Sequence, residues 1–290
     1  MAKTARKPSG TREWSQFSQN CHRILHKNTQ AGSTDLKQSS FGGCLHDCRY
    51  CYGRAALVRR GKIRPEQWAD PTRHTLDLYE VLKRRPHRTG VTMFPTMHDI
   101  WPALAGSAAE LGHTFEHAGS PLLVVSKPHI EVIEQLTHAW NTPRHRALIA
   151  FRFTITTCDG ELASFWEPGA PKIAERLEAA RLAVAKGFRV SFSVEPMLDV
   201  ETTHRLLELL HEISPQGELW VGTMRRPRQR VKCNDDATSA ALDDIVADQT
   251  PLRVQKMVGR VAAMRKVAPR VRWKDSVQEI MGFHTPAEMP

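Results

Sequence analysis

Residues Ala150–Thr156 read AFRFTIT, and residues Arg189–Glu195 read RVSFSVE. In the first stretch the apolar side chains of Phe151, Phe153 and Ile155 alternate with polar ones, and the second stretch alternates in the same way. Strict alternation of this length is typical of a β-strand with one apolar and one polar face. Parallel strands that helices cover on both sides are instead apolar on both faces. The two stretches therefore predict strands whose polar face lines an interior that holds a ligand.

The rest of the chain alternates between short β-like runs and segments with helical spacing of apolar residues. The β-like runs are Lys37–Phe41, Val91–Pro95, Leu122–Ser126, Leu148–Thr156, Phe188–Glu195 and Leu219–Thr223. Helices are expected near residues 49–60, 74–84, 101–117, 129–139, 171–186, 202–213 and 251–267. This order predicts βα units and a parallel sheet. The α/β fold that fits is a partial (β/α)6 TIM-type barrel, with partly exposed edge strands as the alternative explanation of the polar faces.

Charge divides the chain unevenly. Residues 1–90 carry 18 Lys and Arg against 7 Asp and Glu, whereas the remainder carries 23 against 24. We expect a basic N-terminal extension over 1–35, the barrel core over 36–225, and a C-terminal extension with a helix over 226–290. No apolar run reaches the roughly 18 residues that a membrane helix needs. The first residues also lack the apolar stretch of a secretion signal, so we expect a cytoplasmic protein without a membrane partner.

Three of the six cysteines lie close together in FGGCLHDCRYCY, which spans Phe41–Tyr52. Cys44, Cys48 and Cys51 follow the spacing C-x3-C-x2-C, and Gly42 and Gly43 allow a tight turn into the loop. Three thiolates suit zinc or an iron–sulfur cluster. A structural zinc ion would need a fourth ligand, for which His46 or His22 are the nearby candidates. One short loop can instead hold three irons of a [4Fe–4S] cluster and leave the fourth iron open.

This cysteine spacing after the first predicted strand resembles the radical S-adenosylmethionine (SAM) superfamily. The stretches CLHDCRYCY, LLVVSKP, RFTITT, EPGAPKIAERLEAARLAVAKGFRVSFSVEPML and ELWVG occur in an order that resembles its spore photoproduct lyase-like branch, over about residues 37–225. The resemblance implies a [4Fe–4S] cluster whose fourth iron is chelated by SAM. It also implies an external electron donor such as flavodoxin or ferredoxin, and reductive cleavage of SAM to a 5′-deoxyadenosyl radical.

The resemblance assigns SAM contacts to several positions. Tyr50 is expected against the adenine, and Lys127 matches a lysine that contacts the SAM carboxylate. Thr154 or Thr156 matches a hydroxyl residue near the methionine moiety. The alternatives are that Tyr50 packs against a helix and that Lys127 is exposed to solvent.

Two further SAM contacts follow from the positions of polar residues. Ser193 and Glu195 are expected to meet the ribose hydroxyls, with a salt bridge from Glu195 to Arg152, Arg176 or Arg189 as the alternative. FPTMHDI stands where many family members have a Gly-Gly-Glu element, so Thr96, His98 and Asp99 are its polar replacements.

The hydrogen-atom donor of spore photoproduct lyase has no counterpart here, because no cysteine lies between Cys51 and Cys158. Cys158 follows a predicted strand, where the active sites of such barrels lie. It is a candidate thiol donor to a substrate radical, and a buried inert cysteine is the alternative. Trp166 and Glu167 are expected to form a loop at the mouth of the substrate site; the alternative is that Pro168 and Pro171 simply start the next helix.

A second basic run, formed by Arg225, Arg226, Arg228, Arg230 and Lys232, follows the last predicted strand. Together with the basic first third of the chain it predicts DNA or RNA as a partner. The alternative is that these arginines cover acidic side chains of neighbouring helices. Three functions remain open: a radical SAM enzyme acting on a nucleic acid or nucleotide, one acting on a peptide or small metabolite, and a non-catalytic, metal-stabilised nucleic-acid-binding protein.

Overall fold

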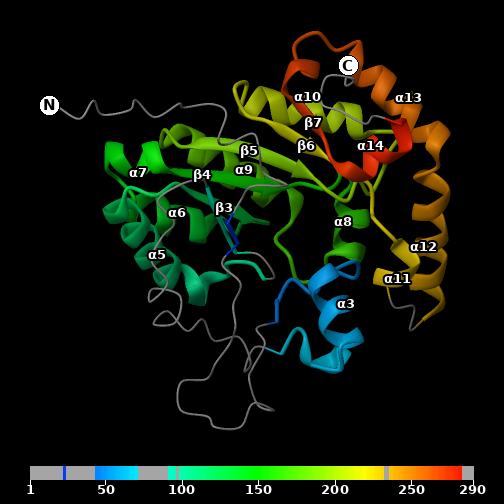
Figure 1. The fold of residues 1–290 in the computed structure, drawn as a ribbon, viewed down its shortest axis with the longest axis horizontal. Coiled ribbons are helices and arrows are strands. Elements are labelled where there is room, and N and C mark those ends of the chain that lie inside the picture. Colours follow the sequence, from blue (N-terminus) through cyan, green and yellow to red (C-terminus); the bar gives the residue numbers. More distant parts are fainter. Residues whose placement is uncertain (1–21, 24–42, 71–90, 96–97, 232–234, 283–290) are drawn as a thin grey trace, which may run out of the picture.

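The computed structural model describes residues 22–23, 43–70, 91–95, 98–231 and 235–282. Their strands form one parallel sheet in chain order, β1-β2-β3-β4-β5-β6-β7. The strands are β1 His22–Arg23, β2 Thr92–Phe94, β3 Leu122–Ser126, β4 Ile149–Thr154, β5 Arg189–Val194, β6 Leu219–Val221 and β7 Val271–Trp273. Each strand pairs with its predecessor, as in a TIM-type barrel. Among the described strands β1 does not pair with β7, so the barrel is partial (Figure 1).

Helices follow one another around the outside of the sheet. Neighbouring helices pack together in the order α5–α6–α9–α10–α13, the order in which a barrel wraps its helices. The bounds are α3 Tyr52–Arg59, α5 Ala105–Ala118, α6 Ile130–Ala139, α7 Pro143–Leu148, α8 Gly160–Trp166, α9 Ile173–Ala185, α10 Thr203–Ile213, α11 Pro227–Arg230, α12 Asp236–Asp248, α13 Pro251–Ala262 and α14 Asp275–Met281. Short 3-10 turns cover Pro65–Gln67, Pro102–Leu104 and Ala268–Arg270.

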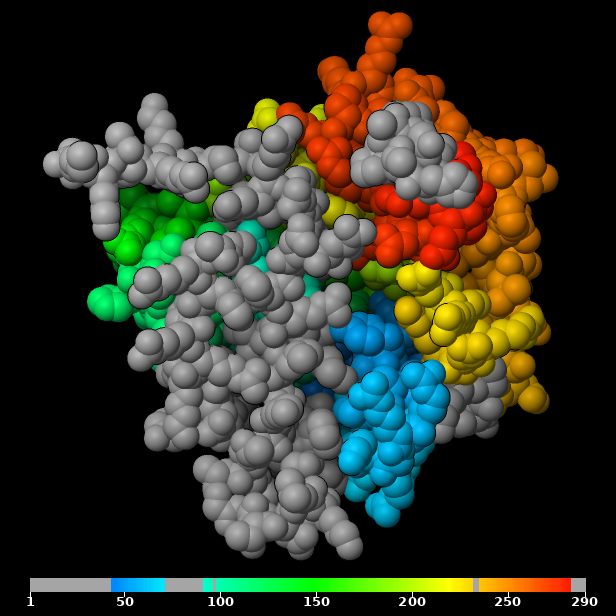
Figure 2. All heavy atoms as spheres, in the orientation of Figure 1, coloured from blue at the N-terminus to red at the C-terminus, as the bar shows by residue number. Residues whose placement is uncertain are grey.

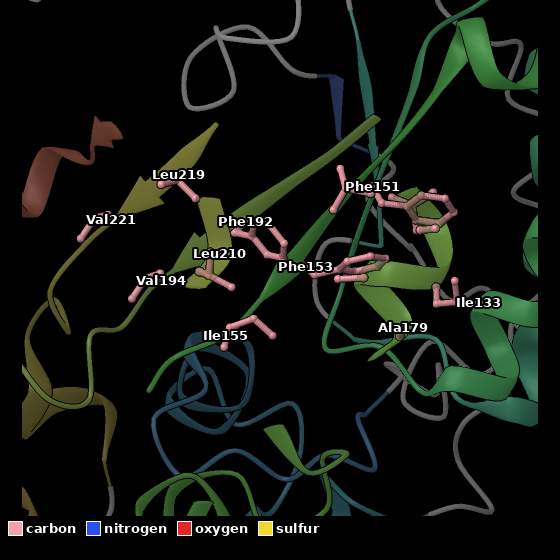
Figure 3. Close-up of a cluster of buried hydrophobic side chains, with 14 of the residues drawn as sticks. Ile133, Phe151, Phe153, Ile155, Ala179, Phe192, Val194, Leu210, Leu219 and Val221 are labelled. Atoms are coloured by element: carbon pink, nitrogen blue, oxygen red, sulfur yellow. The ribbon is translucent and has the colours of Figure 1, made fainter. Parts of the chain in front are cut away.

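The apolar faces of β4 and β5 pack under these helices. Phe151, Phe153 and Phe192 are fully buried, and Figure 3 shows them pointing into a cluster with side chains from α6, α9 and α10. The rings of Phe151 and Phe153 stack at 5.3 Å between centroids. Burial of aromatic surface of this size is the main force that holds helices against a sheet. The alternation in the two strands therefore predicted correctly which side chains face the helices.

The opposite strand face is polar, as predicted, and part of it is filled by charged side chains. Arg152 is buried, donates from Nε to Ser191 Oγ at 3.0 Å and lies 3.4 Å from a carboxylate oxygen of Glu218. Its guanidinium group also stacks over the Trp220 ring at 4.7 Å from the centroid. Arg152 and Ser191 lie in the middle of their strands. The other polar residues of this face lie beyond them, at the carboxyl ends of the strands.

The sheet contains strands at both ends that the sequence did not predict. The expected strand Lys37–Phe41 lies outside the described residues, and β1 lies within the segment expected to be an N-terminal extension. β7 adds to β6 from within the segment predicted to be a helical C-terminal extension. The sheet therefore continues past residue 225. A two- or three-residue strand is too short to produce a readable alternation.

The long helices agree with the predictions. α5, α6, α9, α10 and α13 match the helices expected near 101–117, 129–139, 171–186, 202–213 and 251–267. The helix expected near 49–60 is confirmed as α3, and the one near 74–84 lies outside the described residues. The helices α7, α8, α11, α12 and α14 were missed. No described helix is both long and apolar enough to cross a bilayer.

One tight contact between α5 and the end of α6 gives a test of the helix layer. A Cβ atom on Gly112 would lie 2.2 Å from the ring of Trp140, which is fully buried and donates from Nε1 to the Ala109 carbonyl oxygen. We expect Gly112→Ala to lower the free energy of unfolding by about 1–3 kcal/mol, because the indole must move. Gly106→Ala in the same helix meets no atom within 4 Å. Urea unfolding should show no loss for that control, and equal losses in both variants would contradict the packing.

Candidate functional site

The cysteine loop, Cys44–Cys51, leads directly into α3 (Figure 1). All three thiols are free; those of Cys44 and Cys48 are buried and that of Cys51 is half-buried. Within the loop, the Cys51 N–H donates to the Cys48 carbonyl at 3.0 Å and the Asp47 N–H donates to the Cys44 carbonyl at 3.2 Å. The Cys44 N–H donates to the Trp68 carbonyl at 3.0 Å. The loop thus gathers three potential thiolate ligands in a short, mostly buried turn.

The thiols are close enough to influence one another. Burial, followed by the charge of Asp99 and the other two thiols, raises the pKa of Cys44 well above its usual value. Burial, against the opposing charge of Lys127, raises the pKa of Cys48 to about 12. Without a bound metal centre the thiols of Cys44 and Cys48 are therefore protonated at neutral pH. A bound metal centre would supply the positive charge that stabilises their thiolates.

His46 does not complete a zinc site with these thiols. It is buried, its Nδ1 lies 3.2 Å from an Asp99 carboxylate oxygen, and its Nε2 lies 3.4 Å from Nε2 of His129. The His129 ring in turn lies 3.7 Å from the carboxylate of Glu175. Both ring nitrogens of His46 thus face other side chains. Among the described residues no three His, Cys, Asp or Glu side chains converge closely enough to hold one metal ion.

A buried carboxylate lies beside the loop. Glu167 is about 1% exposed and accepts hydrogen bonds from the Tyr50 hydroxyl and, at 3.0 Å, from the Thr156 hydroxyl. Arg176 Nη1 lies 2.5 Å from the other carboxylate oxygen of Glu167. Lys127 Nζ lies 3.9 Å from the oxygen that accepts from Tyr50 and Thr156. Burial would raise the pKa of Glu167, but Arg176, Lys127 and the tyrosine hydroxyl lower it below the ordinary value. The ionised carboxylate therefore joins the cysteine loop to the carboxyl ends of two strands.

This arrangement corrects one prediction. Trp166 and Glu167 are buried, so they do not form the mouth of a substrate site. The ion pair between Glu167 and Arg176 was not predicted. The two residues are nine positions apart, on either side of a loop, and no feature of the sequence indicates that they pair. Lys127 is not the exposed loop lysine of the alternative reading, since its side chain is only 14% exposed.

Asp99 holds the end of β3. It accepts from the Ser126 hydroxyl, and from the Lys127 N–H at 2.8 Å. Burial would raise the pKa of Asp99, but His46 and the contacts with Lys127 lower it to about 2. Burial lowers the pKa of Lys127, whereas Cys48 and Glu167 raise it, and the net effect is upward. Asp99 and Lys127 thus lie together and ionised, whereas Thr96 lies outside the described residues.

A second polar group lies at the ends of β5 and β7. Glu195 pairs with Lys274, whose Nζ also lies 3.4 Å from the Ser193 hydroxyl. The alternative partners of Glu195, all arginines, are therefore wrong, and Lys274 was missed because it follows an unpredicted strand. Arg230 is near enough to feel the charge of Glu195. Thr154 is buried at the end of β4, where its carbonyl oxygen lies 3.5 Å from Arg176 Nη1.

The remaining predicted residues lie farther out. Cys158 is exposed between β4 and α8, so the prediction of a buried inert thiol is wrong; partial burial and the charge of Asp199 raise its pKa. Arg225 pairs with Glu279 and lies 4.0 Å from Asp275, and Arg228 donates to Asp243 at 2.7 Å. These two arginines do cover acidic side chains of α12 and α14, as the alternative reading stated. Arg226 is exposed, with a left-handed backbone.

Comparisons with known proteins agree with the fold. No protein-family model matches the chain. A solved structure of a cysteine-to-serine mutant of spore photoproduct lyase superposes with a TM-score of 0.50 and 17% identity, over 80% of this chain and 75% of that one. The two chains therefore share a fold, the partial βα barrel described above. An uncharacterized protein of Acidianus two-tailed virus, ORF301, is 24% identical over 164 residues, which make up 53% of each chain, so the match spans about half the length of that relative.

The ion pair between Glu167 and Arg176 can be tested by stability. Arg176→Met should lower the free energy of unfolding by about 3–5 kcal/mol, because it leaves a buried carboxylate without its nearest cation. Arg181→Met replaces an exposed residue of the same helix and should alter the free energy of unfolding by less than about 0.5 kcal/mol. Urea denaturation of the metal-free chain compares them. Similar stability of both variants would show that Glu167 does not depend on Arg176.

Proposed function

We propose that this chain is a radical SAM enzyme that binds a [4Fe–4S] cluster through Cys44, Cys48 and Cys51 and binds SAM at the remaining iron. The observation that carries the proposal is the set of three free thiols in one loop, beside the carboxyl ends of the strands of a partial parallel barrel. Active sites of βα barrels lie at those ends. The cytoplasm and an external donor such as flavodoxin or ferredoxin would supply the reducing conditions.

The residues present fit a cluster better than a single ion. In a cubane each iron takes its own thiolate, so the three sulfur atoms need not converge on one point. A zinc ion would need four converging ligands, and both ring nitrogens of His46 already face Asp99 and His129. Bound together, the cluster and SAM would supply reductive cleavage and a 5′-deoxyadenosyl radical.

The charges around Glu167 support binding of the SAM carboxylate. Lys127 Nζ lies 3.9 Å from Glu167, beyond hydrogen-bond distance, whereas Arg176 lies closer to that carboxylate. The Lys127 ammonium can therefore donate a charge-assisted hydrogen bond to a second carboxylate, that of SAM. In this proposal Tyr50 lies against the adenine, and Thr96, Asp99, Thr154 and Thr156 border the methionine moiety.

Two groups are proposed to act at the other end of the cofactor. Ser193 and Glu195 accept from the ribose hydroxyls, and Lys274 holds the carboxylate of Glu195 for that contact. Cys158, exposed at the end of β4, is the proposed thiol donor to a substrate radical.

Anaerobic reconstitution tests the cluster. Wild type should take up iron and sulfide near 4:4 and release 5′-deoxyadenosine from SAM on reduction, since three thiolates anchor the site. Cys44→Ala, Cys48→Ala or Cys51→Ala should each lose the cluster. Cys158→Ala, a matched loss of a thiol elsewhere, should keep the full iron content. Stable zinc with no SAM cleavage would instead support a non-catalytic, metal-stabilised protein.

The proposed substrate is a nucleic acid or nucleotide. The excess of positive charge over residues 1–90 supports it, as does the position of the second basic run. α11, which contains Arg228 and Arg230, packs against α3 directly after the cysteine loop. Figure 2 shows the yellow surface of this segment beside the blue surface of the loop and α3. A phosphate backbone held by this run would pass close to the cysteine loop.

Salt dependence tests this partner. Replacing Arg225, Arg226, Arg228 and Arg230 with Ala should weaken binding to any DNA or RNA and reduce the log–log salt slope by about 1–4, since each phosphate contact contributes about 0.9. Replacing Arg253, Lys256, Arg260 and Arg265 with Ala removes the same charge from the region of α13 and should change the slope less. Anisotropy over a salt series measures both. No binding by wild type at low salt would favour a peptide or small metabolite as substrate.

A further inference from the structure

The segment Phe165–Gly169 spans the last residues of α8 and the start of the link to α9; it is called the α8–α9 connection below and lies alongside the cysteine loop. The Arg49 N–H donates to the Trp166 carbonyl at 2.9 Å, and the Gly169 N–H donates to the His46 carbonyl at 3.0 Å. Arg49 Nε also donates to the Phe165 carbonyl at 2.7 Å. The first two bonds join, backbone to backbone, two segments more than a hundred residues apart in sequence. Neither segment is a strand, so no sheet would otherwise fix their distance.

Gly169 sets how closely the two segments approach. A Cβ atom at this position would lie 2.0 Å from the Leu45 carbonyl oxygen and 3.1 Å from Cα of His46. Both contacts are with backbone atoms, which cannot rotate away as the end of a side chain can. Any larger residue here must therefore push the cysteine loop away from the connection, while the backbone angles of Gly169 lie outside the left-handed region and suit alanine.

Glu167 fixes the connection to the barrel. It lies between Tyr50, which comes from the loop, and Thr156 and Arg176, which come from the end of β4 and from α9. One fully buried side chain therefore holds both the loop and the barrel at the same place. The Tyr50 ring also lies against Trp166 of the same connection, 6.4 Å between centroids.

The loop has little structure of its own that would hold it in this shape. Its internal backbone bonds, Asp47 N–H to Cys44 and Cys51 N–H to Cys48, close two single turns. Asp47 also takes positive φ, an uncommon conformation for a residue with a side chain. Backbone contacts to the loop from outside it come from the connection and from Trp68, and the side chains of Asp99, Arg54 and Thr238 also contact the loop.

We propose that the α8–α9 connection positions the cysteine loop. Gly169 allows the loop to approach closely, and Glu167 binds it through Tyr50. Cluster assembly therefore depends on residues distant in sequence from the cysteines. The part that concerns the cluster rests on the proposed radical SAM function. The part that concerns the loop does not, because it applies to the metal-free chain. Gly169 and Glu167 are positioning residues and touch no reacting atom.

The test compares Gly169→Ala with Gly160→Ala, whose added Cβ meets no atom within 4 Å and which lies at the start of α8. Neither change alters charge, so the thiol pKa values are not changed directly. In the metal-free, reduced protein, alkylation by iodoacetamide is followed by peptide mass spectrometry at Cys44 and Cys48, with exposed Cys158 as the internal reference. We expect Gly169→Ala to speed modification of both buried thiols at least about tenfold relative to Cys158, and Gly160→Ala to match wild type.

Reconstitution gives the second readout. Gly169→Ala should bind less than half the iron of Gly160→Ala, with equal far-UV circular dichroism. If Gly169→Ala does not fold, Tyr50→Phe, which removes only the hydroxyl bonded to Glu167, should show a smaller change in the same direction. Alkylation rates equal to those of wild type in the folded variants would overturn the inference. Absence of iron in wild type would overturn the proposed function instead, and the alkylation rates would still decide the positioning role.

Discussion

The buried carboxylate of Glu167 is the constraint on which the rest of the site depends. A carboxylate that is removed from water costs several kcal/mol unless cations and hydrogen-bond donors surround it. Arg176, Lys127, Tyr50 and Thr156 supply these, and they come from α9, the end of β3, the cysteine loop and the end of β4. Satisfying one charge therefore brings four separate parts of the chain to one point, beside the thiols.

The strands that have one apolar and one polar face make this arrangement possible. Their apolar faces bury Phe151, Phe153 and Phe192 under the helices, so the opposite faces are left to polar groups. Midway along β4, Arg152 pairs with Glu218, which directly precedes β6. At the carboxyl ends lie the buried side chains of Thr154, Thr156 and Ser193, and Thr156 donates to Glu167 beside the cysteine loop. The apolar core and the proposed site thus use different faces of the same strands.

Much of the fold could be predicted from local pattern, because alternation and helical spacing are properties of neighbouring residues. The core strands, the long helices and the cysteine loop belong to this class. β1 and β7 were missed because two or three residues carry no period. The pairs Glu167–Arg176 and Glu195–Lys274 were also missed, because their partners are 9 and 79 positions apart in sequence and no local pattern encodes such contacts. The resemblance to a family pointed to Lys127, but only the fold places it beside a buried ion pair.

The three thiolates of the loop are proposed to hold a cluster whose fourth iron is open to SAM. Electron paramagnetic resonance of the reduced, reconstituted protein tests it most directly. Adding SAM should change the g values of a reduced [4Fe–4S] signal, because amino and carboxylate ligands replace weaker ones at a single iron, and methionine should not reproduce the change fully. A cluster signal that is identical with and without saturating SAM, or no cluster signal at all, would contradict the account.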